Sequence, residues 1–163
     1  MKKILIALFL ISLAFGLNVA YGQYFAPSLT TIYQDNELQP GQRYGLDLKY
    51  YAIQRDKEYF LGYTYAYGEN QYSDNDLLRL SIGCKTGHRF KYGAMASAIG
   101  YRTVNYPEST KDQYAVSMAV SPLVSYELSK YFYIESGMSV TAFQMGDFKV
   151  MNSYFFSFGM RWH

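Results

Sequence analysis

The sequence predicts an all-β protein, a closed antiparallel eight-stranded up-and-down transmembrane β-barrel. Three observations favour this fold class: eight segments with two-residue periodicity, connections that alternate between long and short, and an aromatic-rich composition that is not apolar overall. The 163 residues include 19 Tyr and 11 Phe, yet the mean hydropathy is only −0.16. A helical membrane protein is far more apolar, whereas alternation on a membrane barrel gives this composition.

Residues 1–22 have the features of a secretory signal peptide, which leaves residues 23–163 as the barrel domain. Two lysines precede an apolar run over residues 4–17, and Ala20 and Gly22 place small residues before a cleavage site. A membrane anchor is the rival interpretation, but a spanning helix needs about 20 apolar residues. No later segment has an apolar run of that length, so we expect no transmembrane helix in the rest of the chain.

Loss of the signal peptide makes the chain formally neutral. The 15 Lys and Arg residues include two in residues 1–22, which leaves 13 basic residues against 13 acidic ones. This balance gives no reason to expect nucleic-acid binding. The single cysteine, Cys84, excludes an intrachain disulfide. We expect it to be a small buried or lipid-facing residue rather than a reactive thiol.

The first four expected strands are residues 24–33, 42–54, 58–68 and 76–86. The first contains Pro27, which cannot donate to a ladder and suggests a bulge or a local irregularity. The other three place bulky apolar residues on one face and small or charged residues on the other. Successive side chains of a strand point to opposite faces, so this period of two predicts strands with two different environments.

The last four expected strands are residues 89–103, 113–127, 131–143 and 151–162. The final three alternate clearly, although Pro122 lies inside one of them and suggests a second irregularity. Residues 89–103 alternate between an alanine face and a mixed face, and the sequence does not assign the lipid side. The alanine face carries Ala94, Ala96 and Ala98, and the mixed face carries Gly93, Met95, Ser97 and Ile99.

The connections between these segments alternate in length from long to short. They are residues 34–41, 55–57, 69–75, 87–88, 104–112, 128–130 and 144–150. Outer-membrane barrels have short periplasmic turns and longer outer loops. With both termini in the periplasm, an even number of strands gives this alternation with the correct phase.

The charged residues of the strands fall on the face that carries small side chains. An eight-stranded barrel is just wide enough for side chains to fill its interior, so we expect this face to line the lumen. Buried charges must pair with one another or form hydrogen bonds, which predicts a structural ionic core without an open channel, rather than a catalytic site or an ion path. The residues expected in this core are Arg43, Asp47, Lys49, Arg79, Lys85, Glu127, Glu135 and Arg161.

Tyrosines gather near the ends of the expected strands, as in the aromatic girdles at membrane interfaces. Near the short turns they are Tyr50, Tyr51, Tyr59, Tyr131 and Tyr133, and near the long loops they are Tyr33, Tyr44, Tyr67, Tyr72, Tyr101 and Tyr114. The alternative explanation is ordinary β-propensity, which also favours tyrosine.

A cleaved signal, eight strands and the aromatic final segment YFFSFGMRW, residues 154–162, resemble small outer-membrane barrels of the OmpA/OmpX kind. Residues 121–130, SPLVSYELSK, are similar to the outer-membrane β-barrel domain of Bacteroidota-type bacteria. The resemblance is one of pattern. It implies that the last strand is the signal for the barrel-assembly machinery, although His163 follows the terminal aromatic residue. The residues that would carry this signal are Tyr154, Phe156, Phe158 and Trp162.

The histidine content argues against an enzyme. Nucleophilic hydrolysis needs a base beside the serine, and lipid A deacylases and palmitoyltransferases of this barrel type rely on a histidine. His88 falls in a short turn and His163 at the C-terminus, and neither begins a His-x-Ser-Asn motif. Two distant histidines and one cysteine do not make a metal-ligand set either. We therefore expect no enzyme activity, no catalytic residue, no cofactor and no metal.

The function expected from these patterns is that of an integral outer-membrane barrel with a structural or interaction role. Such a barrel is non-conducting and is a candidate accessory subunit of a larger outer-membrane complex. Its expected partners are outer-membrane lipid, the barrel-assembly machinery and other outer-membrane proteins. Three alternatives stay open: an outer-membrane lipid-modifying enzyme, a soluble periplasmic ligand-binding barrel with its bulky face inside, and a conducting pore.

Overall fold

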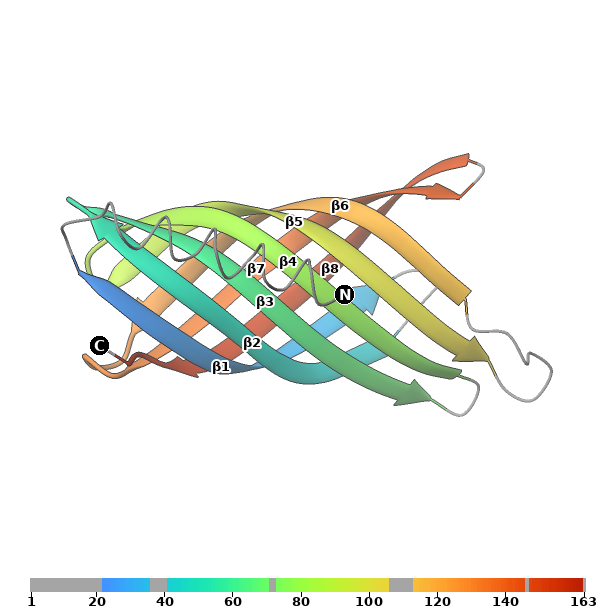
Figure 1. Ribbon diagram of the computed structural model, residues 1–163, viewed down its shortest axis with the longest axis horizontal. Helices are drawn as coiled ribbons and strands as arrows, with labels where there is room; N and C mark the ends of the chain where they lie inside the picture. Colours follow the sequence, from blue (N-terminus) through green and yellow to red (C-terminus); the bar gives the residue numbers. More distant parts are fainter. Residues whose placement is uncertain (1–21, 36–40, 71–72, 106–112, 146, 163) are drawn as a thin grey trace, which may run out of the picture.

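Eight antiparallel strands close into one barrel in the computed structural model of the protein, and each strand pairs with its neighbours in the sequence (Figure 1). The structure describes residues 22–35, 41–70, 73–105, 113–145 and 147–162. The strands are β1 (Gln23–Asp35), β2 (Gly41–Gln54), β3 (Lys57–Asn70), β4 (Ser73–Gly87), β5 (Phe90–Asn105), β6 (Gln113–Glu127), β7 (Phe132–Met145) and β8 (Asp147–Met160). The predicted fold class is therefore confirmed.

Neighbouring strands are staggered, so that hydrogen-bonded partners followed once around the barrel return to a different residue of β1. Partners lead from Phe25 through Tyr50, Leu61, Ile82, Ala96, Val120, Val140 and Asn152 back to β1 at Asp35. The return point is ten residues further along β1, from position 25 to position 35. A stagger of this kind tilts the strands and fixes the width of the interior, and the tilt is plain in Figure 1.

Two of the expected loops are wrong in length. Strand β3 continues to Asn70 and β4 resumes at Ser73, so most of residues 69–75 belong to strands. Strand β7 likewise continues to Met145, and β8 begins at Asp147 within the expected loop 144–150. Polar residues do not end these strands, because a hairpin beyond the membrane can continue its ladder in water. The signal peptide, residues 1–22, lies outside the described residues except for Gly22, and it stays a prediction.

Pro27 and Pro122, the two prolines that the sequence places inside strands, each interrupt one ladder without shifting its register. Strand β6 pairs with β7 as far as Val120 and again from Leu123, and Pro122 lies in the gap. Strand β1 pairs with β8 from Ser28 onward, and the ladder is completed by an isolated bridge between Phe25 and Trp162 on the other side of Pro27. The expected irregularities are present, but neither is a bulge.

The outer wall of the barrel carries the bulky apolar side chains. Val116 and Met118 on β6 are 78% and 73% exposed, and Leu29 on β1 is similarly open. The interior instead combines charged and hydroxyl side chains with several aromatic ones. This polarity is the reverse of that of a soluble barrel, so the alternative with the bulky face inside is wrong.

Strand β5 now has an assigned lipid side. Ala94, Ala96 and Ala98 point outward, whereas Met95 and Ile99 are buried in the interior. Cys84 on the neighbouring β4 is also exposed on the outer wall, so its lipid-facing interpretation is the correct one.

The girdle assignment was wrong for three tyrosines. Tyr51, Tyr101 and Tyr133 are only 0%, 3% and 1% exposed and face the interior. Tyr50 and Tyr51 are adjacent, so a strand must send them to opposite faces. The tyrosines that do point outward near the strand ends are Tyr33, Tyr44, Tyr59, Tyr67, Tyr114 and Tyr131. Tyr72 lies outside the described residues.

Candidate functional site

The eight charged residues expected in the lumen all point into it. Three come from β2, two from β4, one each from β6 and β7, and Arg161 follows β8. Seven of them are buried, and Glu127 at the end of β6 is half-buried. We define this set, together with Glu58 and Lys91, as the lumen network.

Glu135 is the centre of the lumen network. Its carboxylate accepts hydrogen bonds from the ammonium groups of Lys49 and Lys85, with a Lys85 Nζ–Glu135 Oε2 distance of 3.2 Å. The Lys49 Nζ atom also lies 3.0 Å from the Asp47 Oδ2 atom. All four side chains are buried, so each charge has its counter-charge where water cannot screen it.

Glu58 and Lys91 extend the network towards the short-turn end of the barrel. Lys91 forms ion pairs with both Glu58 and Glu127, and Lys85 Nζ lies 3.7 Å from Glu58 Oε2. Glu127 is in turn 2.6 Å from a guanidinium nitrogen of Arg161. The resulting chain alternates in sign from one residue to the next: Asp47, Lys49, Glu135, Lys85, Glu58, Lys91, Glu127, Arg161.

Sequence analysis missed Glu58 and Lys91 for different reasons. Glu58 is an even-numbered residue of β3, like Phe60 and Gly62, so the period of two does place it on the lumen face. It was overlooked because it begins the expected strand. Lys91 belongs to residues 89–103, where the lipid side was not assigned.

Two arginines lie in the half of the lumen away from the short turns, and each donates a hydrogen bond to an uncharged side chain. Arg43 donates to the Gln34 side-chain oxygen at 2.7 Å. Arg79 donates to the Thr64 hydroxyl at 3.2 Å, and that hydroxyl donates to Asp47 at 2.8 Å. Thr64 therefore connects Arg79 to Asp47 within the lumen network.

Aromatic rings fill the space between the charges at the short-turn end. Tyr24 and Tyr51 are stacked with ring centres 4.5 Å apart. The Lys85 ammonium lies 4.5 Å from the centre of the Tyr51 ring, and the Arg161 guanidinium lies 5.2 Å from that of Tyr24 and 5.6 Å from that of Tyr133. Cations over ring faces are attracted by the ring quadrupole, so these rings are part of the electrostatic packing.

Among the described residues, no histidine lies beside the serines of the lumen. The histidine that the structure describes, His88, is exposed in the turn after β4 and does not reach the interior. His163 lies outside the described residues. In the same part of the chain no group of three or more His, Cys, Asp or Glu side chains could hold a metal ion.

A search of the described residues for a helix with the length and hydropathy of a membrane span found none.

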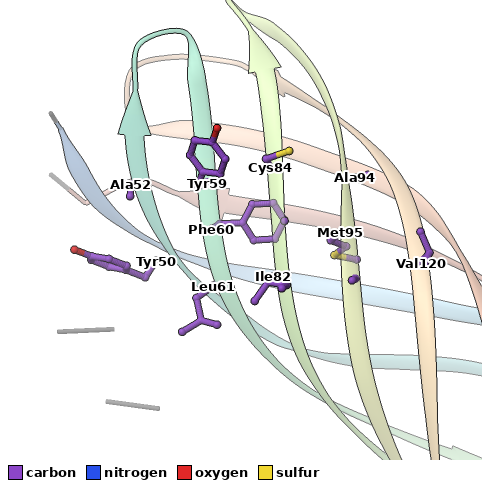
Figure 2. Close-up of a pocket in the computed structure, with 12 residues that line it drawn as sticks. Tyr50, Ala52, Tyr59, Phe60, Leu61, Ile82, Cys84, Ala94, Met95 and Val120 are labelled. Atoms are coloured by element: carbon purple, nitrogen blue, oxygen red, sulfur yellow. The ribbon is translucent and has the colours of Figure 1, made fainter. Parts of the chain in front are cut away.

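An apolar hollow of about 540 Å³ lies against strands β2 to β6 (Figure 2). Its lining includes Tyr59, Leu61, Cys84, Ala94 and Val120. The lining contains no acid, base or histidine, so the Cys84 thiol has no partner there to activate it. The lining of the hollow is apolar and suits contact with hydrocarbon chains.

The four residues of the expected assembly signal all point outward. Tyr154, Phe156 and Phe158 alternate along β8 with buried residues, and Trp162 is 69% exposed. The backbone of Trp162 exchanges hydrogen bonds of 3.0 and 2.7 Å with that of Phe25. The C-terminal segment therefore completes the closure of the barrel against β1.

Similar folds occur among solved structures, although no family model and no curated protein matches the sequence. The N-terminal β-barrel domain of OprF from Pseudomonas aeruginosa aligns with a TM-score of 0.69 at 12% identity, covering 85% of this chain and 97% of that one. Neisserial surface protein A (NspA) aligns with a TM-score of 0.60 at 15% identity, covering 86% and 96%.

A third structure is Ail, the attachment invasion locus protein of Yersinia pestis, in complex with the heparin analogue sucrose octasulfate. It aligns with a TM-score of 0.54 at 13% identity, covering 86% of this chain and 96% of that one. The chain has the fold of a small outer-membrane β-barrel. The expected resemblance in fold is confirmed. Because the sequence identities are this low, the comparison shows a shared fold and nothing about function.

Proposed function

We propose that this outer-membrane barrel is exported to the outer membrane, spans it without conducting, and has a structural or interaction role there. The observation that supports the proposal most strongly is the chain of alternating charges within the lumen network, which runs unbroken from Asp47 to Arg161. Both termini lie on the short-turn side in this proposal, which is the periplasmic side of such barrels.

The argument against conduction is one of space and charge. An eight-stranded interior has room for side chains and little else, and Arg43, Lys49, Lys85, Tyr51 and Tyr133 are large side chains buried within it. An ion would have to displace paired charges in a medium of low dielectric constant, which costs several kcal/mol per ion.

Planar-bilayer recording tests non-conduction directly. The protein purified in detergent and inserted into the bilayer should give no reproducible unitary current steps, and its slower migration after boiling should confirm that it was folded. A Glu135→Gln variant should begin to leak, because Lys49 and Lys85 lose the acid that they share. Regular current steps from the unmodified protein would refute the proposal.

We also propose that the barrel is not an enzyme, since no histidine among the described residues faces the lumen. Mass spectrometry of lipid A from cells with and without the protein would test this. Identical lipid A profiles are expected, and loss or gain of an acyl chain would support the alternative of a lipid-modifying enzyme.

An accessory role in a larger outer-membrane complex is the finer part of the proposal. Exposed aromatic side chains along β8, such as Phe156 and Phe158, could contact a second barrel as readily as lipid. Crosslinking in the native membrane followed by mild-detergent capture should recover a defined outer-membrane partner in constant proportion. Recovery of the barrel alone would remove this part of the proposal.

A further inference from the structure

The turns at the short-turn end expose four cations. Arg55 and Lys57 lie at the β2–β3 turn, Arg89 at the β4–β5 turn, and Lys130 at the β6–β7 turn. We call these four residues the basic rim. All four are exposed, and within the described part of the chain none of them forms an ion pair.

The acids that neighbour the basic rim in the sequence do not neutralise it. Glu58 is buried in the lumen, where it pairs with Lys85 and Lys91. Glu127 is held by Lys91 and Arg161. Asp56 remains at the surface, where its carboxylate lies 3.4 Å from the Thr86 hydroxyl that donates to it. The lumen network thus removes two acids from the surface, and the rim keeps four cations against one acid.

An exposed aromatic side chain follows the cation in each of the three turns. Phe90 comes directly after Arg89 and Tyr131 directly after Lys130, whereas Tyr59 comes two residues after Lys57. All three rings are exposed on the outer wall. The Lys130 ammonium lies 4.6 Å from the centre of the Tyr131 ring. Aromatic residues with adjacent cations are the pattern of a membrane interface, where rings lie among headgroups and cations meet phosphates.

The distribution of the rim favours a lipid leaflet over a protein. Two strands separate the β2–β3 turn from the β4–β5 turn and the β4–β5 turn from the β6–β7 turn, so the cations follow an arc of the barrel end instead of forming one patch. A planar layer of phosphates can meet all the cations of this arc at once, whereas a compact docked protein would cover only part of it. A polar hollow of about 450 Å³ lies between the β2–β3 and β4–β5 turns, but its lining contains two acids, Asp56 and Glu58, beside Arg55 and Lys91, so we do not assign a headgroup to it.

The opposite end of the barrel has the reverse charge. Among the residues whose side chains the structure describes there, Asp74 and Asp76 of β4 stand against one base, Arg102 of β5, which pairs with Asp76. Within the described residues, the excess of exposed, unpaired cations is therefore found at the short-turn end.

We propose that the basic rim binds the phosphate groups of anionic phospholipids, such as phosphatidylglycerol, in the leaflet that faces the short turns. The inference rests on the proposed function, because it requires the barrel to span a bilayer. Lipid binding at this rim holds the barrel at a fixed depth, since the cations stay at the phosphates while the rings stay below them.

The single tryptophan of the chain provides the test, because Trp162 lies exposed at the same end. The protein is reconstituted in phosphatidylcholine vesicles that contain an equal fraction of either brominated phosphatidylglycerol or brominated phosphatidylcholine. Bromine quenches Trp162 fluorescence only in close contact, so the ratio of quenching reports which lipid lies beside the rim.

Brominated phosphatidylglycerol should bind beside Trp162 about three- to five-fold more strongly than brominated phosphatidylcholine at low salt. The preference should fall towards one in about 1 M salt, where charges are screened within a few Å. It should also fall towards one in the variant that combines Arg55→Gln, Lys57→Gln, Arg89→Gln and Lys130→Gln. The matched control is Arg102→Gln, which removes an exposed arginine paired with Asp76 at the other end and should leave the preference unchanged.

A single Lys130→Gln variant keeps the test usable if the fourfold variant does not fold. It should lower the preference in part, because the neighbouring Tyr131 accepts a backbone hydrogen bond from Arg161, next to Trp162. Equal quenching by the two lipids in the unmodified protein would overturn the inference. The basic rim would then be a candidate binding surface for an acidic protein. Absence of quenching by either lipid would instead mean that the wall is not in a bilayer, and this outcome would refute the proposed function itself.

Discussion

Lys85 on β4 and Glu135 on β7 lie 3.2 Å apart across the lumen, although their strands share no backbone hydrogen bond. The pair joins opposite sides of the barrel wall, and Lys49 from β2 meets the same carboxylate. Glu135 therefore connects three strands that the ladder alone would link only through their neighbours.

Loss of the Glu135 charge should destabilise the barrel strongly. Glu135→Gln keeps the shape but leaves Lys49 and Lys85 buried beside a neutral amide. Removing one member of a buried ionic group costs about 3–5 kcal/mol, and the free energy of unfolding in urea, measured in vesicles, should fall by that amount. A control that removes Lys85 as well, Glu135→Gln with Lys85→Met, should recover part of the loss. A neutral effect of Glu135→Gln alone would show that the network contributes little to stability.

The ion pair between Arg161 and Glu127 should be weaker, because Glu127 is half-buried and a second cation, Lys91, shares its carboxylate. A double-mutant cycle with Arg161→Gln and Glu127→Gln should give a coupling energy of about 1–2 kcal/mol. Strict additivity of the two substitutions in urea unfolding would mean that the contact does not form in the membrane.

Gly137 on β7 should not tolerate a side chain. A Cβ atom there would lie 2.5 Å from the backbone oxygen of Pro122 and 2.6 Å from the Phe155 ring. The backbone oxygen cannot move aside as a flexible side chain can, so Gly137→Ala should cost about 1–3 kcal/mol of unfolding free energy. The matched control is Gly100→Ala, whose Cβ would meet nothing closer than 4.0 Å. Equal unfolding curves for the two variants would contradict this expectation.

Trp162 should matter for assembly more than for stability. Its side chain is exposed, and its bridge to Phe25 is made by the backbone. If the last strand is the assembly signal, Trp162→Ala should lower the folded, heat-modifiable fraction in cells several-fold. The same variant refolded in vesicles should keep its unfolding free energy within about 1 kcal/mol. Parallel losses in both measurements would indicate a folding defect and no role in recognition.

Much of the fold and of the lumen follows from the alternation of side chains along single strands. Arg43, Asp47 and Lys49 share one parity in β2, so knowing that the small-residue face points inward is enough to place all three. The same rule would have found Glu58. It failed for Lys91, because alanine and glycine give β5 no polarity contrast, and for Tyr51, because an aromatic residue near a strand end suits either environment.

The sequence by itself determined the number of strands and, outside β5, the face on which most charges and most bulky side chains lie, because these depend on a period of two that is local to each strand. Only the tertiary structure decided which charges meet. The ten-residue stagger brings Lys49, Lys85 and Glu135 to one level, where the two lysines share one carboxylate. A stagger is a property of the closed sheet as a whole, so no single segment contains it.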